Sequence, residues 1–222
     1  MTESTEVATT EPASVPALAA TPSVELTAED VALPSIKLGQ YMSDHVQEDR
    51  VPAGSIFSCL GQDDPDPVVL WEQGGDELVL FHVLALKKGK SISEGGELVL
   101  FAYDDPDVPA DAWTTYNYTV VLPKVDQEMP YKFLLTKTGQ PAAKNINTVI
   151  AKNLSNTPAH QLAFTLDCVQ RENKKGKFFV PRVRQVEAAD EDIKVVEGIL
   201  PMVEVQQAAA PASTASADEP AI

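Results

Sequence analysis

The chain has little of the chemistry from which metal centres, disulfide frameworks and nucleophilic active sites are built. Its 222 residues include only two cysteines, Cys59 and Cys168, and three histidines. Two cysteines cannot form a disulfide framework, and no histidine has a neighbouring Cys or second His at the spacing of a zinc site. Neither cysteine lies in a signature for nucleophilic catalysis. We therefore expect a protein that is not an enzyme and that holds no metal or cofactor.

Signals for export and membrane insertion are also missing. There is no run of about eighteen apolar residues, which argues against a spanning helix. Residues 1–12 carry acids and no basic stretch, so we expect no secretory signal. Together with the scarcity of cysteine, these absences predict a cytoplasmic protein without a membrane partner.

Two local patterns begin like ligand sites and then fail on their spacing. Residues 87–91 end like a phosphate-binding P-loop, but the earlier glycine of that motif would fall at Leu84, inside an expected strand. The Asp-rich stretches at residues 63–66 and 104–107 lack the twelve-residue calcium loop with its distal Glu. We interpret all three stretches as ordinary turns.

Both ends of the chain differ in composition from the middle. Residues 1–32 are rich in Thr, Ala, Pro and Glu, and residues 206–222 in Ala, Ser and Pro. Such segments bury too little apolar surface to offset the entropy of ordering them, so we expect a disordered leader and a disordered tail. Residues 33–205 are expected to form one domain.

Strand patterns fill the first half of this domain, and helical periodicity appears later. Runs of β-branched and aromatic residues predict strands at residues 77–89, 97–105, 113–122 and 131–137. An apolar stripe predicts a helix from Gln140 to about Leu154. A hairpin follows over residues 162–186, turning at residues 173–176, and a closing helix is expected over residues 188–200.

This element order favours a mainly β fold with α (α+β), namely an OB-like antiparallel barrel with one helix before the final hairpin. An open α+β sheet with the same order is the alternative. The pentapeptide Glu-Leu-Val-Leu-Phe occurs at residues 77–81 and again at residues 97–101. We interpret the two copies as similar strand entries rather than as a repeat architecture.

The charge of the chain is segregated along its length. The net charge is −16, but residues 124–184 hold 11 Lys and Arg against 4 Asp and Glu. Residues 1–123 hold 5 against 21, and residues 185–222 hold 1 against 8. The basic segment therefore predicts one side of the protein that prefers an anion.

Aromatic residues overlap this basic segment, and single-stranded nucleic acid needs both features. Cations neutralise closely spaced phosphates, and rings stack on bases without reading their identity. The candidate cations are Lys132, Lys137, Lys174, Lys175, Lys177, Arg182 and Arg184, and the candidate rings are Trp113, Tyr116, Tyr118 and Phe178. We expect them on a common concave surface.

Strand alternation divides the residues of the second hairpin strand between two faces. Phe178, Arg182 and Arg184 point one way, which suits a phosphate-facing groove, whereas Phe179 and Val183 point the other way and fill the core. Lys174 and Lys175 would reach over the bound strand from the hairpin tip.

Five segments of the domain carry a resemblance to a known family. They are Leu33–Gln40, Pro52–Phe57, Tyr131–Leu135, Ala142–Lys144 and Asn173–Pro181. These segments resemble a group of tailed-bacteriophage OB-fold single-stranded DNA-binding proteins. The resemblance implies that the protein coats exposed strands during phage DNA replication or recombination, in the host cell cytoplasm and without catalytic residues. It also implies that the acidic end at residues 217–222 contacts replication or recombination proteins.

Two other functions fit the same composition. One is a structural or interaction module, such as a virion or scaffold component with disordered arms, whose basic segment meets an acidic protein surface. The other is an inhibitor whose acidic first half mimics DNA. The sequence does not separate DNA from RNA as the partner, and it leaves homo-oligomerisation open.

Overall fold

The structure is a computed structural model that describes residues 32–61, 63–94 and 97–209. Most of the two segments expected to be disordered, residues 1–32 and 206–222, lie outside the described residues. The exceptions are Ala32 and the C-terminal side, where a helix continues to Ala209, four residues past the expected domain boundary at residue 205.

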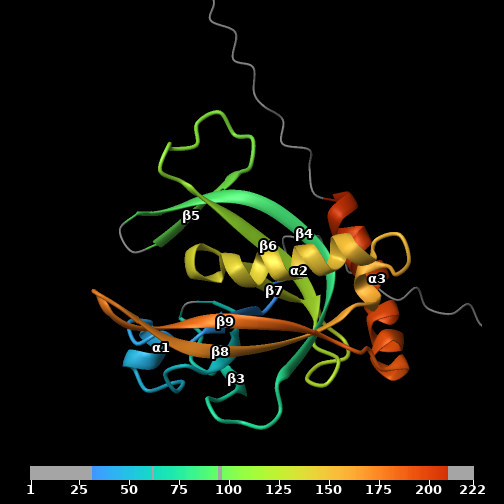
Figure 1. The fold of residues 1–222 in the computed structure, drawn as a ribbon, viewed down its shortest axis with the longest axis horizontal. Coiled ribbons are helices and arrows are strands. Elements are labelled where there is room, and N and C mark those ends of the chain that lie inside the picture. Colours follow the sequence, from blue (N-terminus) through green and yellow to red (C-terminus); the bar gives the residue numbers. More distant parts are fainter. Residues whose placement is uncertain (1–31, 62, 95–96, 210–222) are drawn as a thin grey trace, which may run out of the picture.

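One continuous sheet forms the body of the described chain (Figure 1). Its nine strands are β1 (Ser35–Leu38), β2 (Ile56–Cys59), β3 (Val68–Trp71), β4 (Val79–Glu94), β5 (Glu97–Ala102), β6 (Trp113–Val121), β7 (Tyr131–Leu135), β8 (Ala163–Asn173) and β9 (Gly176–Val186). They lie in the order β3-β2-β1-β7-β6-β4-β8-β9, and β5 pairs with β4. All these pairs are antiparallel except β1 with β7.

The mainly β, α+β fold class is confirmed. The path of hydrogen-bonded strands has two ends within the described residues, at β3 and at β9, so the sheet is not closed into a barrel. The expected OB-like barrel is therefore not confirmed. The strands expected between residues 77 and 137 are present, whereas β1, β2 and β3 were not predicted as strands. These three have only four residues each, too few to show a periodic pattern.

Helices pack against several strands of the sheet. They are α1 (Asp44–Gln47), η1 (Lys137–Gly139), α2 (Gln140–Asn153), η2 (Ala159–Gln161) and α3 (Asp190–Ala209). α2 begins with a proline in its first turn, as expected, and it packs against β6, β7 and β9. Figure 1 shows α2 crossing in front of the sheet, with the tip of the β8–β9 hairpin and α3 on opposite sides of the molecule.

The long strand β4 connects two parts of the sheet. Its first residues, Val79–His82, pair with β8, and its last residues pair with β5 in a hairpin that extends away from the body (Figure 1). The core lies where β4, β7 and β8 meet. There the Phe81 ring is 5.8 Å from Phe133 and 5.5 Å from Phe164, measured between ring centroids. Ile146 of α2 is fully buried in the same cluster.

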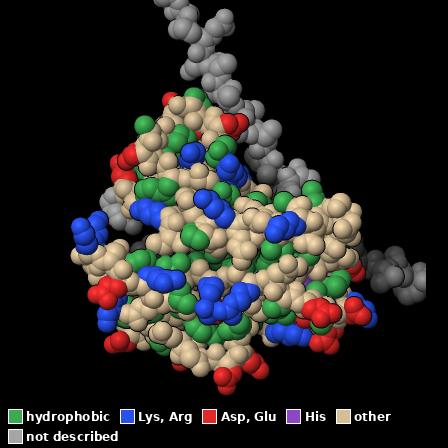
Figure 2. Space-filling model, viewed as in Figure 1, with side chains coloured by type: hydrophobic (Ala, Val, Ile, Leu, Met, Phe, Trp, Pro, Cys, Tyr) green, Lys and Arg blue, Asp and Glu red, His purple; other side chains and the backbone are tan. Residues whose placement is uncertain are grey.

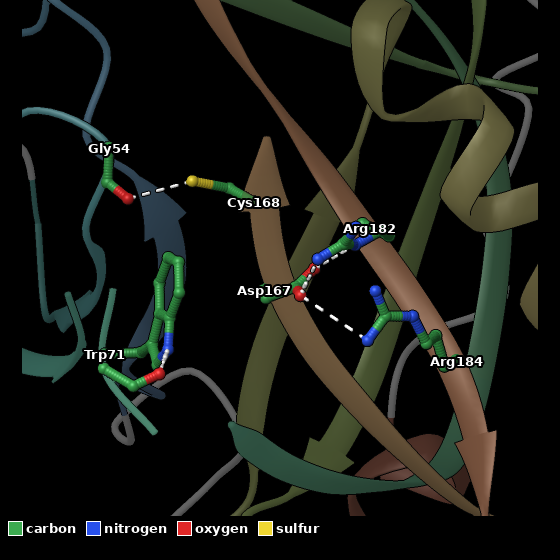
Figure 3. A network of polar contacts seen from close by, with 7 residues as sticks. Gly54, Trp71, Asp167, Cys168, Arg182 and Arg184 are labelled. Atoms are coloured by element: carbon green, nitrogen blue, oxygen red, sulfur yellow. Dashed lines mark hydrogen bonds and ion pairs between the residues drawn. The ribbon is translucent and has the colours of Figure 1, made fainter. Parts of the chain in front are cut away.

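Side chains rather than strand pairing join β8 and β9 to the region around β1. The Gln40 carboxamide donates to the carbonyl of Phe179 at 2.8 Å and accepts from its amide at 2.9 Å. The Cys168 thiol donates to the Gly54 carbonyl at 2.9 Å (Figure 3). Gly54 has a φ of +81°, and a Cβ there would lie 2.6 Å from the Phe179 ring, so only glycine fits. We call this line of contacts the seam.

The last helix is fastened to the loop after β6. Val196 and Ile199 bury their side chains against Val121, and the Lys124 ammonium lies 2.7 Å from Glu191 and 2.8 Å from Asp192. α3 continues through Pro201 and keeps Val203 buried, which explains why it passes the predicted end at residue 200. None of the helices in the described part of the chain is long and apolar enough to cross a membrane.

Candidate nucleic-acid interface

The alternation predicted for β9 is present in the structure. Phe179 and Val183 are buried, at 1% and 4% exposure, while Arg182 and Arg184 are exposed on the other face. Both arginines lie beside Asp167 of β8, whose side chain is 6% exposed (Figure 3). Arg182 binds both carboxylate oxygens, with its Nε 2.7 Å from Oδ1, and Arg184 lies 3.8 Å from Oδ2. The carboxylate thus offsets part of the charge of the pair and fixes its position.

The tip of the β8–β9 hairpin carries the next cations. Lys174, Lys175 and Lys177 are exposed, and Phe178 is half-buried. Gly176, at a φ of +121°, allows the turn. The Asn173 side-chain oxygen also stabilises it by accepting a hydrogen bond from the Lys175 backbone amide at 2.8 Å. The tip also lines an open depression of about 280 Å³, together with residues from beyond β1 and from η1.

Trp113 and Lys137 form a pair at the start of β6. The Lys137 ammonium lies 3.6 Å from the centroid of a Trp113 ring, a cation–π contact. Lys137 adopts a φ of +34°, which is uncommon for a residue with a Cβ. Lys88 of β4 makes a second such contact, 3.6 Å from the Tyr103 ring centroid. Two exposed lysines are therefore held over aromatic rings.

The tyrosines of β6 are not placed as the sequence analysis expects. Tyr118 has 0% exposure, and its hydroxyl lies 2.9 Å from Asn147 Oδ1 and 3.2 Å from the Ala143 carbonyl of α2. Burial raises the pKa of its phenol, which stays protonated. Tyr116 is half-buried against the core. The expectation that Tyr118 stacks on bases is wrong for this structure, because α2 covers the face of β6 that carries both rings.

Four open depressions adjoin one another from β4 across β6 and β7 to β1 and the hairpin tip. The first two, of about 520 and 220 Å³, share Lys87 and Asn117. Leu134 lines both the second depression and a third of about 340 Å³, and Gln40 and Thr138 line both the third and the depression at the hairpin tip. We call this row of four depressions, which share lining residues, the trough. The cations that line it are Lys37, Lys87, Lys88, Lys90, Lys132, Lys175 and Lys177.

The structure thus divides the predicted set of site residues. Lys132, Lys175, Lys177 and Phe178 line the trough, and Lys137 lies between two residues that line it. Arg182 and Arg184 project from the opposite face of β9 to Pro181, which lines the trough. Figure 2 shows Lys and Arg side chains over the face that carries α2, β8 and β9, with the acids mostly toward its edge. The cations expected on one concave surface occupy two.

Sequence reasoning missed several residues of this region. Lys87, Lys88 and Lys90 belong to the acidic first half of the chain, but β4 pairs with β6 and brings them to the trough. Their Lys-Lys-Gly-Lys pattern was the available signal. Asp167 and Gln40 carry no local signal, because their partners lie 15 and 139 residues away.

Among the described residues, no group of three or more His, Cys, Asp or Glu side chains is placed to hold a metal ion. Burial raises the pKa of the Cys168 thiol to about 11, so at neutral pH it remains a protonated donor to Gly54.

Comparisons with known proteins add no family to this description. No protein-family model matches the chain, and no curated protein or solved structure shows significant similarity to it. The site is therefore interpreted from its own geometry.

Proposed function

We propose that this protein is a non-catalytic, sequence-tolerant single-stranded DNA-binding protein with an OB-like domain, which coats exposed strands during DNA replication or recombination. The observation that carries the proposal is the trough, a row of depressions lined by lysines from β1, β4, β7 and β9. A chain of phosphates is the partner that such a row of cations fits.

The trough lysines are available to an anion. Within the described residues, none of Lys87, Lys132, Lys175 and Lys177 makes an ion pair, and all four are exposed. Each phosphate contact they make would release a condensed counterion, which favours binding at low salt. Lysine contacts of this kind do not read base identity, which supports sequence-tolerant binding.

Rings near the lysines favour a single strand over a duplex. Phe178 lines one end of the trough, and Trp113 and Tyr103 lie under the ammonium groups of Lys137 and Lys88. A ring can stack only on a base whose face is free, and in a duplex both faces of each base are covered by its neighbours.

The replication or recombination partners expected for the acidic tail concern residues outside the described chain, and they stay a prediction.

Binding of a labelled oligonucleotide tests the proposal directly. Fluorescence anisotropy of a thirty-nucleotide oligothymidylate should report binding that weakens steeply with salt. If about six lysines meet phosphates, the slope of log K against log salt concentration is roughly −4, at about −0.7 for each phosphate of a single strand. A duplex of equal length and polyglutamate serve as controls. No binding at low salt, or equal binding of polyglutamate, contradicts the proposal.

One observation favours the alternative, a structural or interaction module. β5 pairs only with β4 within the described chain, and its Leu98 and Leu100 are 40% and 53% exposed. Exposed apolar side chains on an edge strand are typical of association surfaces. Sedimentation with and without oligonucleotide separates the two functions. Self-association that is indifferent to oligonucleotide, in a protein that binds no strand, would favour the module.

A further inference from the structure

The third depression of the trough differs from the others because it opens into the core. β1 and β7 run parallel and pair only at Ser35 with Lys132 and at Ile36 with Phe133. Beyond these pairs the two strands separate. Gly39 bonds instead to the far side, donating to the Ser55 carbonyl at 2.9 Å and accepting from the Gly54 amide at 2.7 Å. The divergence leaves a slot of about 340 Å³ between the strands.

The slot has an apolar interior and a polar mouth. Ile36, Phe133, Leu135 and Leu166, all buried core residues, line its inside. Its mouth carries Thr136 and Thr138, whose hydroxyls make no hydrogen bond within the described residues. The volume falls within the roughly 300–1,000 Å³ of ligand pockets, which are likewise mostly apolar with a few polar groups. This combination suits a flat aromatic ligand with polar edges.

The surroundings of the slot indicate how such a ligand would be attached. Leu134 lines both the slot and the depression that carries Lys87, Lys88 and Lys90, and Thr138 lines both the slot and the depression that carries Lys175 and Lys177. A strand whose phosphates contact both groups of lysines passes over the mouth. Charge on both sides of an apolar opening therefore favours a nucleobase that is covalently linked to phosphates.

We propose that the slot between β1 and β7 binds one base turned out of the stack of a single strand lying in the trough. This inference rests on the proposed function and adds a subsite to it. The hydroxyls of Thr136 and Thr138 can both donate and accept, so they can hydrogen-bond to the edge of any base. The subsite thus holds the strand in place without selecting its sequence, and a base that is already unpaired enters it at the least cost.

An abasic strand separates the slot from the lysines. The full chain is titrated with oligothymidylate and with an abasic oligomer of the same length, which keeps the phosphates and has no bases. We expect wild-type protein to bind oligothymidylate about tenfold more tightly. The double variant Thr136→Leu/Thr138→Leu removes both hydroxyls and fills the mouth. It should lose most of this preference while binding the abasic strand unchanged.

Thr148→Leu is the matched control, because Thr148 is exposed on α2 and bonds to its own helix. A wild-type protein that binds both strands equally, or a double variant that keeps the full preference, overturns the slot and leaves the proposed function standing. Binding of neither strand overturns both.

A second measurement covers the case in which the double variant does not fold, as judged by thermal melting. Wild-type protein is cross-linked to a strand that contains 4-thiothymidine, and the attached peptides are identified by mass spectrometry. Adducts within residues 35–40 or 133–139 support the slot. Adducts confined to residues 171–184 contradict it.

Discussion

The trough lysines and the β9 arginines are both basic, but they are held in different ways. Lys87, Lys132 and Lys177 are exposed and form no ion pair within the described residues, whereas Arg182 and Arg184 lie against the nearly buried Asp167. A free exposed cation contributes little to folding and keeps its charge for a ligand. A cation that compensates a buried carboxylate belongs first to the fold. Counting the cations of β9 therefore overstates the positive charge that this strand offers to a ligand.

The largest expected effect comes from reversing the free cations. The triple variant Lys87→Glu/Lys132→Glu/Lys177→Glu should lower affinity for oligothymidylate by about a hundredfold or more. It should also flatten the salt slope by about 2, because three phosphate contacts are lost. Its stability should change little, since the three side chains are exposed. Anisotropy at several salt concentrations and a thermal melt measure both.

A variant with the same change in net charge is the control for this prediction. Lys144→Glu/Lys152→Glu/Lys194→Glu alters three exposed lysines of α2 and α3 that do not line the trough. If the control loses as much affinity as the trough variant, overall charge rather than the trough governs binding.

The next effect concerns stability. Arg182→Ala should lower the free energy of unfolding by about 1–3 kcal/mol, because it leaves the Asp167 carboxylate buried without its main partner. Lys132→Ala should change it by less than about 0.5 kcal/mol. Urea denaturation measures both, and adding Asp167→Asn to Arg182→Ala should restore part of the loss. Equal stability of the two single variants would remove the distinction between the cation classes.

The smallest effect is expected at Lys137, which falls between the two classes because a ring, not a carboxylate, is its partner. Lys137→Ala should weaken oligonucleotide binding by about two- to threefold and should shift the emission of Trp113, since an exposed cation over a ring contributes roughly 0.5–1 kcal/mol. Trp71 is buried in the core and should emit as before. Unchanged emission would show that the contact is not maintained in solution.

Local sequence patterns predicted much of the fold. The β-branched runs of β4 to β7, the apolar stripe of α2 and the alternation that buries Phe179 and Val183 all appear in the structure. The two Glu-Leu-Val-Leu-Phe segments show the limit of such patterns. Val79 and Phe81 of the first copy are buried in the core beside β8, whereas the matching Val99 and Phe101 of the second copy, in β5, are only half-buried. The same pentapeptide contributes to a strand twice, although β4 begins only at Val79, and distant partners decide how deeply it is buried.

The candidate site was predicted less completely, for a related reason. Charge was divided by position along the chain, but the trough is assembled by strand pairing, which places Lys87 of β4 opposite Asn117 of β6. Alternation placed Tyr116 and Tyr118 on one face of β6 and could not say that α2 covers it. The parallel pairing of β1 with β7, and thus the slot, depends on contacts almost one hundred residues apart, as between Ile36 and Phe133.

The seam does with side chains what strand pairing does elsewhere in the sheet. Two hydrogen bonds from one carboxamide and one from a thiol link Phe179 and Cys168 to the region around β1, where a closed barrel would have a ladder of backbone hydrogen bonds. These bonds contribute roughly 1 kcal/mol net each, and the burial of Phe179 and Cys168 in the core adds to them. The open side of the sheet is therefore held shut by core packing as well as by hydrogen bonds.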